Sequence, residues 1–347
     1  MAKQADLAGR IGHAAAAAVK TAWFGAHYVA ARRASGPVLE KGETLKLSRP
    51  LPKLGDLLGA IRALIAADRA NVERGFYPAP DGPPLNIARA MTMSRRFLAD
   101  AGAVARRRRE GAGQEVADTR TDLPRYYRQN FHYQTDGYLS ADSAALYDFQ
   151  VETLFGGTAQ AMRRQALPLL AEAFAGRDQR RLKLLEVACG TGALTAEIAR
   201  AFPRLAIAAI DPSTDYLAAA GKRLAASPGV RFAEGFAENL GFADASFDAA
   251  ASCYLFHELP PKVRKAVAAE LARVVKPGGV YVHVDSLQLG DTPVFDGLLE
   301  AFPRLFHEPY YETYGKLDLD ALFGAAGFTQ VRATTGFLTK AVLFRRV

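Results

Sequence analysis

The stretch LLEVACGTGAL, residues 184–194, decides how the C-terminal half of this chain is interpreted. An apolar run that includes the acid Glu186 leads into a loop of small residues with Gly190 and Gly192. This pattern is typical of a buried strand that turns sharply into a helix. Several nucleotide and cofactor loops begin in this way, so the residues after Gly192 must decide between them.

Two phosphate-binding loops do not fit these residues. A P-loop requires lysine followed by serine or threonine after its last glycine, but Ala193 and Leu194 follow Gly192. A dinucleotide fingerprint requires a third glycine, and Thr195 stands at that position. The loop is therefore expected to hold a part of a cofactor other than a phosphate group.

Strand and helix patterns alternate from residue 182 to the end of the chain. The predicted strands are 182–187, 205–210, 230–233, 247–253, 279–285, 329–334 and 337–345, and the predicted helices are about 191–202, 213–226, 260–275 and 317–326. Such alternation indicates a parallel α/β sheet with helices on both faces. The short connection that ends at Gly336 cannot make a parallel crossover, so the last strand is predicted to be antiparallel.

The loop resembles motif I of the class I S-adenosylmethionine-dependent methyltransferases. Three later segments resemble that family in the same order: AIAAIDPSTDYL at 206–217, GFAENLGFADASFD at 235–248 and LARVVKPGGVYVHVD at 271–285. The residues of these segments are similar to those of the type 11 methyltransferases and of the ubiquinone and menaquinone C-methyltransferases. The resemblance implies a Rossmann-like sheet of seven strands and the cofactor S-adenosylmethionine. A nicotinamide enzyme is the alternative, and the missing third glycine argues against it.

The resemblance also implies which residues contact the cofactor. Glu186 would lie near the methionine amino group, and Asp211, nineteen residues after Gly192, would accept the ribose hydroxyls. The other expected cofactor contacts are Ala188, Cys189, Gly190, Thr191, Gly192, Pro212, Phe236, Ala237, Glu238 and Ser252. Two residues depart from the family. Ala188 replaces the usual first glycine, and Phe236 replaces an aspartate that hydrogen bonds to the adenine.

Candidate catalytic residues follow the strands or lie in an aromatic segment. His257 comes after the fourth strand and is the first candidate for a general base, and Asp285 ends the fifth strand. Tyr127 and His132 belong to the aromatic segment DLPRYYRQNFHYQTDGYLS, residues 122–140. Together with His307, the histidines match no known spacing of metal ligands, so no metal is predicted.

The organisation predicted is a helical domain over 1–170 and the methyltransferase domain over 171–347. Helices are expected at 1–35, 54–72, 87–109, 141–155 and 158–174. The aromatic segment at 122–140 either covers the cofactor as a lid that helps to bind the acceptor or packs the first domain onto the sheet. Both interpretations remain open at this point.

The charge of the chain is distributed unevenly. Residues 1–170 contain 24 Lys and Arg against 16 Asp and Glu, whereas the remainder has 20 of each. The basic helix at 1–35, with aromatics near its end, can lie on a membrane surface or pack on the body of the protein. Two cysteines in 347 residues and no apolar span long enough for a bilayer indicate a cytoplasmic protein, peripheral to the membrane at most. Nothing in the sequence indicates an oligomeric state.

The expected function is methyl transfer to a small or medium lipophilic acceptor, such as a quinone, polyketide, isoprenoid or lipid. The basic first half also suits a nucleic-acid methyltransferase, because aromatic side chains can stack on bases. The absence of an Asn/Asp-Pro-Pro-Tyr motif at 252–255 weighs against that alternative. A second alternative is a noncatalytic scaffold subunit that binds the cofactor, which Phe236 suggests.

Overall fold

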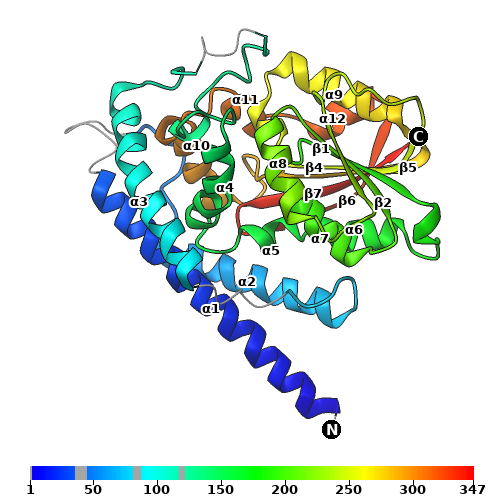
Figure 1. Ribbon diagram of the computed structural model, residues 1–347, viewed down its shortest axis with the longest axis horizontal. Helices are drawn as coiled ribbons and strands as arrows, with labels where there is room; N and C mark the ends of the chain where they lie inside the picture. Colours follow the sequence, from blue (N-terminus) through cyan, green and yellow to red (C-terminus); the bar gives the residue numbers. More distant parts are fainter. Residues whose placement is uncertain (1, 36–44, 81–86, 117–121) are drawn as a thin grey trace.

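The computed structural model describes residues 2–35, 45–80, 87–116 and 122–347. Its centre is a seven-stranded sheet in the order β3-β2-β1-β4-β5-β7-β6 (Figure 1). The strands are β1 (Lys183–Val187), β2 (Ala206–Asp211), β3 (Val230–Glu234), β4 (Phe247–Cys253), β5 (Val275–Ser286), β6 (Phe328–Gly336) and β7 (Thr339–Arg346). Strands β1 to β5 are parallel, and β7 is antiparallel to both of its neighbours. The predicted strands and the reversed last strand are confirmed.

Helices cover both faces of this sheet because successive side chains of each strand point in opposite directions. On β1, Leu184 packs with the helices α6 (Ala166–Ala173) and α7 (Ala193–Ala201) and with Leu224, which follows α8 (Thr214–Arg223). Leu185 packs with α9 (Pro261–Val274) and α12 (Leu319–Ala325). The connection between β5 and α12 contains η4 (Pro293–Phe295), α10 (Asp296–Leu305) and α11 (Tyr311–Gly315). The two buried apolar layers hold the strands in place, so the strand ends form a fixed edge.

The first part of the chain is helical, as predicted. Its elements are α1 (Ala2–Ser35), α2 (Leu54–Glu73), α3 (Ile87–Glu110), η1 (Phe131–Tyr133), α4 (Ala141–Leu154), α5 (Ala159–Arg163) and η2 (Gln179–Arg181). Helix α1 lies against α3, α4 and α2 at one side of the molecule (Figure 1). No helix in the described parts of the chain combines the length and hydrophobicity needed to cross a bilayer.

One predicted helix is divided in the structure. The expected single helix at 158–174 forms α5 and α6, with the break at Arg164 and Gln165. Pro168 explains the break, because it has no amide hydrogen to donate to the carbonyl of Arg164. The break makes Arg163 the last residue of a separate short helix.

The aromatic segment packs against the loop and helix that follow β2. Tyr127, Phe131 and Tyr138 form one buried cluster with Tyr216 of α8. The segment is also held by hydrogen bonds. The Ser213 hydroxyl donates to the Tyr138 carbonyl at 2.8 Å, and the Gln134 amide donates to the Tyr216 hydroxyl at 3.0 Å. The segment is therefore fixed to the loop and helix that follow β2.

Candidate functional site

The candidate site lies at the edge where the parallel strands end. The registers of β1, β2 and β4 place Val187 beside both Ile210 and Ser252, so the ends of these strands are level. A cavity of about 90 Å³ lies at this edge and opens to solvent. The aromatic residues of its lining are Tyr126, Tyr127, Phe131, Tyr138, Tyr147, Tyr216, Phe236 and Tyr254. One wall is thus the loop edge of the sheet, and the rest is largely aromatic.

The loop after β1 has an unusual backbone. Ala188, Gly190 and Gly192 all have positive φ angles, of 56°, 55° and 72°. A side chain at Gly192 would lie within 3.0 Å of the Ala220 side chain, so glycine lets α8 pack closely against the loop. Ala188 adopts the left-handed conformation that glycine provides most easily. The loop therefore brings backbone, with little side-chain bulk, to the cavity.

Asp211 connects this loop to the second strand. Its carboxylate accepts hydrogen bonds from the Gly190 amide at 2.8 Å and from the Ser213 amide at 2.9 Å. Burial raises the pKa of Asp211 to about 6, although the two amide donors act against this increase. The carboxylate lines the cavity and holds the loop, so it is placed to accept further hydrogen bonds from a ligand.

The Glu186 carboxyl and the Arg163 guanidinium are both buried without an ion pair in the described part of the chain. Glu186 has one carboxylate oxygen with no hydrogen-bond partner among the described residues, and burial raises its pKa to about 8. Arg163 is buried, and the described residues offer it no carboxylate within ion-pair distance, unlike its neighbour Arg164, which pairs with Asp68. The positive charge of Arg163 lowers the pKa of both the Glu186 carboxyl and the Cys253 thiol, so it acts against the increase that burial causes in each.

The wall beyond β3 contains Phe236, the residue that differs from the aspartate expected from the family. Its ring meets the edge of Tyr127, with 6.0 Å between centroids and an angle of 88° between planes. Two residues later, Glu238 accepts a hydrogen bond of 2.5 Å from the Tyr126 hydroxyl. Both contacts join the loop after β3 to the aromatic segment. Phe236 therefore packs under that segment where an aspartate would be too short and too polar.

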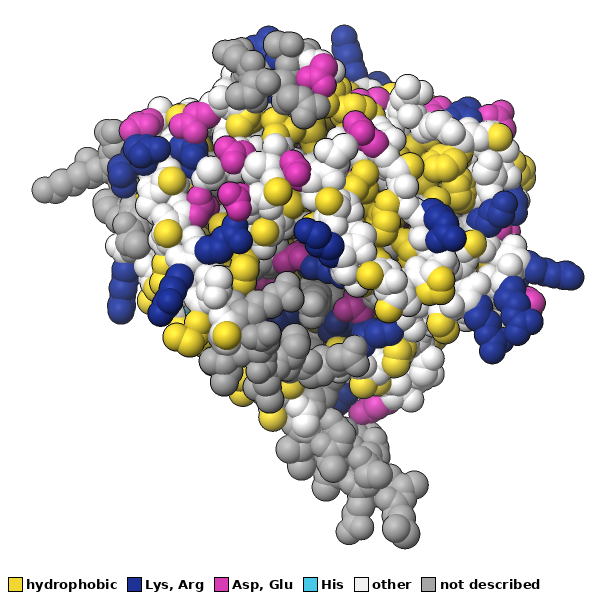
Figure 2. Space-filling view, viewed as in Figure 1, with side chains coloured by type: hydrophobic (Ala, Val, Ile, Leu, Met, Phe, Trp, Pro, Cys, Tyr) yellow, Lys and Arg dark blue, Asp and Glu magenta, His cyan; other side chains and the backbone are white. Residues whose placement is uncertain are grey.

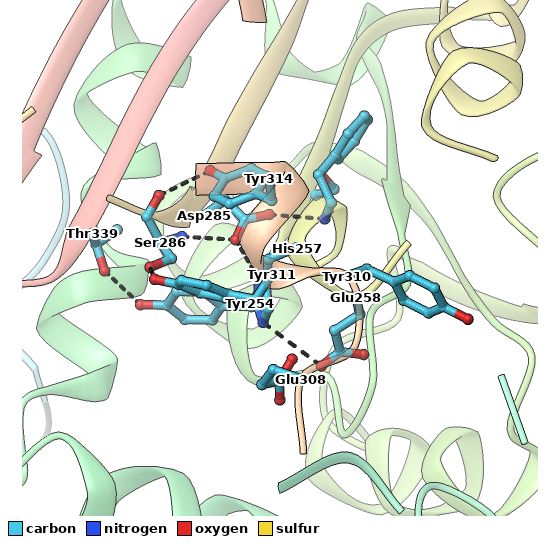
Figure 3. Close-up of polar contacts among 12 residues, drawn as sticks. Tyr254, His257, Glu258, Asp285, Ser286, Glu308, Tyr310, Tyr311, Tyr314 and Thr339 are labelled. Carbon is cyan, nitrogen blue, oxygen red and sulfur yellow. Dashed lines mark hydrogen bonds and ion pairs between the residues drawn. The ribbon is translucent and has the colours of Figure 1, made fainter. Parts of the chain in front are cut away.

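His257 and Asp285 form a buried pair behind the other wall (Figure 3). His257 lies in η3 (Phe256–Glu258), and its Nδ1 atom is 2.5 Å from Oδ1 of Asp285. Asp285 also accepts hydrogen bonds from the amides of Phe256 at 2.8 Å and Ser286 at 2.7 Å. Burial lowers the pKa of His257, but the Asp285 carboxylate outweighs this effect and raises it to about 9. The imidazole is accordingly protonated at neutral pH.

Glu258 stands between this pair and the cavity. Its Oε1 atom is 3.9 Å from Nε2 of His257 and accepts a 2.6 Å hydrogen bond from the Tyr138 hydroxyl. Burial raises the pKa of Glu258 to about 7, while the charge of His257 opposes the increase. Glu308, drawn beside Glu258 in Figure 3, is also buried and lies 3.1 Å from Nδ1 of His132. Glu258 is the member of this cluster that lines the cavity.

Comparison with known proteins shows which family has this architecture. Residues 184–279 match the family model described as a methyltransferase domain. A methyltransferase from Synechocystis is 30% identical over 150 residues, which are 43% of this chain and 68% of that protein. The chain belongs to the S-adenosylmethionine-dependent methyltransferases.

Two further relatives of this methyltransferase have named activities. A ubiquinone/menaquinone biosynthesis C-methyltransferase from Desulfotalea psychrophila is 32% identical over 47% of this chain and 61% of its own length. A fatty-acid O-methyltransferase from Mycolicibacterium smegmatis is 29% identical over 41% of this chain and 51% of its own length. The matches thus span about half to two thirds of these relatives, and more than half of the present chain lies outside them.

The residues of the methyltransferase fit S-adenosylmethionine. A zwitterionic methionine part needs an acceptor for its ammonium and a donor for its carboxylate. The buried Glu186 carboxyl and Arg163 guanidinium have no ion-pair partners in the described chain. The ribose needs an acceptor, and Asp211 lines the cavity. The loop with positive φ angles brings backbone, with little side-chain bulk, to the cavity beside Asp211. The chemistry of the donors and acceptors therefore agrees with the family.

The structure brings together most of the residues expected to contact the cofactor. Of those residues, Ala188, Gly190, Asp211, Pro212, Phe236, Ala237 and Glu238 line the cavity. Glu186, Cys189, Thr191, Gly192 and Ser252 lie outside the lining: the Thr191 hydroxyl donates to Asp148, and the Ser252 hydroxyl bonds to Tyr281 at 2.6 Å. Of the candidate catalytic residues, Tyr127 lines the cavity, and His132, His257 and Asp285 lie behind its wall.

Sequence reasoning did not single out several residues of the site. Arg163, Tyr147 and Tyr254 come from different helices and loops, and none belongs to a motif that sequence alone reveals. Glu258 directly follows His257 in the sequence, but only the structure places it at the cavity. His307 bonds to Gln129 at 2.8 Å, and no cluster of three or more His, Cys, Asp and Glu among the described residues is arranged for a metal ion.

Proposed function

We propose that this methyltransferase acts on a small or medium lipophilic acceptor that loses a proton on methylation. The quinone, polyketide, isoprenoid and lipid classes all include such molecules. The observation that carries the proposal is the aromatic cavity between the cofactor loop and Glu258. Aromatic walls favour apolar or ring-bearing ligands, and an ionisable group such as the Glu258 carboxyl can orient them. The named quinone and fatty-acid relatives support the same range of acceptors.

The protein's own residues form no covalent bond with the substrates in this reaction. When bound, S-adenosylmethionine supplies a methyl group on a sulfonium, and the electron pair of the breaking bond stays on the sulfur. The cavity walls hold the acceptor in line with that methyl group and exclude water. The new bond forms from the acceptor oxygen or carbon, and the proton that leaves this atom goes to the Glu258 carboxylate.

His257 and Asp285 act as positioning residues for that carboxylate. Asp285 keeps His257 protonated, and the positive imidazole favours the ionised form of Glu258. The Tyr138 hydroxyl donates to the same carboxylate and fixes its orientation. A carboxylate with a pKa near neutrality accepts a proton and returns it to solvent at similar free energy, which suits a general base.

Arg163 and Glu186 hold the methionine part of the cofactor in this proposal. We expect Arg163→Gln to weaken S-adenosylmethionine binding about tenfold to a hundredfold, because one charge-assisted hydrogen bond is lost. Decarboxylated S-adenosylmethionine lacks the carboxylate, so its affinity should be nearly the same for the variant and the unchanged protein. Calorimetry with both ligands measures the coupling between Arg163 and the carboxylate.

Arg163→Lys is the matched control for this measurement. It keeps the positive charge and loses the planar pair of donors, so it should keep part of the preference for the carboxylated ligand. If Arg163→Gln distinguishes the two ligands as strongly as the unchanged protein does, Arg163 does not contact the carboxylate.

The acceptor class is tested by labelling. The protein is incubated with methyl-labelled S-adenosylmethionine and either a lipid-soluble extract or total nucleic acid from cells. Label in an organic-soluble product that disappears with Glu258→Gln supports the proposal. Label in RNA or DNA would instead favour nucleic-acid methylation, and cofactor binding without any labelled product in either pool would favour a noncatalytic scaffold.

A further inference from the structure

Helix α1 presents an apolar face to solvent. Exposed positions recur at helical spacing along it, including Ala18, Val19, Ala22, Trp23, Ala26 and Val29. Val19 is 67% exposed, Val29 47% and Trp23 41%. The side chains of residues 2–11 lie outside the described part of the helix. Within the described part, the outward stripe contains small and apolar residues where a surface helix normally has charged ones.

The opposite face of α1 is already covered by the protein. Phe24 packs against Phe149 of α4 at 5.1 Å, and His27 bonds to Ser94 of α3 at 2.9 Å. Lys20 forms an ion pair with Glu152 at 2.7 Å. These contacts fix which face of α1 points outward, so the apolar stripe is left on the exposed side of the helix.

The surroundings of this stripe are basic. The sequence of α1 contains five Lys and Arg and one Asp, and that of the adjacent α3 contains seven Arg, one Asp and one Glu. Exposed arginines of the two helices include Arg33, Arg95 and Arg106, and the exposed apolar residues Met91 and Leu98 lie on α3. Hydrophobic and basic side chains occur together at the left edge of Figure 2, over α1 and α3.

We propose that α1 and α3 form a surface that docks on an anionic lipid bilayer. The stripe that contains Val19, Trp23 and Val29 would enter the headgroup layer, and the arginines would meet the lipid phosphates and carboxylates. A second copy of the chain is a poor occupant, because a symmetric contact would oppose like charges. Nucleic acid is a poor occupant as well, because an aliphatic stripe gives it neither phosphate contacts nor much stacking surface.

The position of α4 connects this surface to the cavity. Phe149 of α4 contacts α1, and Tyr147 on the same helix lines the cavity. Docking would therefore hold the cavity one helix away from the bilayer. This arrangement suits a lipophilic acceptor that is dissolved in the bilayer. Binding of the protein to vesicles does not itself depend on methyl transfer.

The chain has a built-in probe, because Trp23 is its only tryptophan. Full-length protein is mixed with vesicles of phosphatidylcholine alone or of phosphatidylcholine with phosphatidylglycerol, without cofactor or acceptor. We expect binding at least about tenfold tighter to the anionic vesicles, since each basic residue near an anionic surface adds to the attraction. Trp23 emission should shift to shorter wavelength and be quenched by quenchers attached to the lipid chains.

Two variant pairs test the surface itself. Val19→Asp with Val29→Asp keeps Trp23 and should reduce vesicle binding at least about tenfold, whereas Val331→Asp, at a valine that is 44% exposed on β6, should not. Arg33→Glu with Arg95→Glu should abolish the preference for anionic lipid, whereas Lys262→Glu with Lys265→Glu on the distant α9 should preserve it.

Three outcomes would overturn the proposal. The first is the absence of cosedimentation with anionic vesicles. The second is a doubling of mass in solution that the Val19 and Val29 substitutions abolish, which would assign the stripe to a second copy. The third is that the protein fails to bind vesicles but is retained on RNA or DNA in a salt-dependent way, and that the Val19 and Val29 substitutions abolish this retention. Because cofactor binding is measured separately, none of these outcomes affects the proposed methyl transfer.

Discussion

Asp211→Ala is expected to weaken S-adenosylmethionine binding about a hundredfold or more. The substitution removes the acceptor proposed for the ribose and also the partner of the Gly190 and Ser213 amides. Each buried donor left without a partner costs about 1–3 kcal/mol, and a loss of about 3 kcal/mol corresponds to more than a hundredfold in affinity. Calorimetric titration with the cofactor measures the change. Asp320→Ala, at an exposed carboxylate in α12, is the control and should bind normally.

The pH dependence of cofactor binding gives a second test of Asp211. Only the ionised carboxylate accepts hydrogen bonds on both oxygens, and burial raises its pKa to about 6. Protons therefore compete with the cofactor at low pH, so affinity should fall as the pH decreases through about 6. Asp211→Asn should remove this step while leaving any step near pH 8 that comes from Glu186. An unchanged affinity in Asp211→Ala would show that the ribose is bound elsewhere.

Glu258→Gln is expected to lower the rate constant for methyl transfer by about a hundredfold to ten-thousandfold, the usual contribution of a general base. Glutamine keeps the shape of the side chain and still accepts the hydrogen bond from Tyr138, so cofactor affinity should change little. Single-turnover kinetics separate the two effects. Glu258→Asp restores a carboxylate at a shorter reach and should recover part of the rate. A variant Glu258→Gln with the full rate would exclude Glu258 as the base.

The pH profile of the reaction should identify the same group. The base must be ionised, so the rate should rise with pH through about 7, where Glu258 titrates. Replacing His257 with glutamine removes a positive charge that favours the ionised form. The pKa of Glu258 then increases, and the midpoint of the profile should move to higher pH. A merely structural role of His257 would lower the rate at every pH without moving the midpoint.

The sheet could be predicted from the sequence because its signals are local. Each strand of the parallel part is a short apolar run bounded by turn residues, and the sharp turn after Gly336 sets the direction of β7. Gly192 and Asp211 could be placed because the loop and the end of the next strand are fixed by spacing along the chain. Where a local rule was overlooked, as with Pro168 in the divided helix, the prediction was wrong.

The remainder of the site depends on contacts between distant parts of the chain. Arg163 is one of 44 Lys and Arg residues, and only the packing of α5 under the sheet edge distinguishes it. Glu258 became a candidate for the base because the structure shows it, and not His257, at the cavity wall. The contact between His132 and Glu308 joins two segments that are separated in the sequence by most of the methyltransferase domain. No periodicity or motif contains this information.

The hydrogen bonds that fix the aromatic segment have a kinetic consequence. Ser213 bonds to Tyr138 and Glu238 to Tyr126, and these partners stand beside Asp211 and Ala237 at the cavity. We therefore expect the exchange of spent cofactor for fresh cofactor to require these hydrogen bonds to loosen. The aromatic segment lies outside residues 184–279, which match the family model. We expect cofactor exchange past this segment, and not only the chemistry of methylation, to limit the rate of turnover.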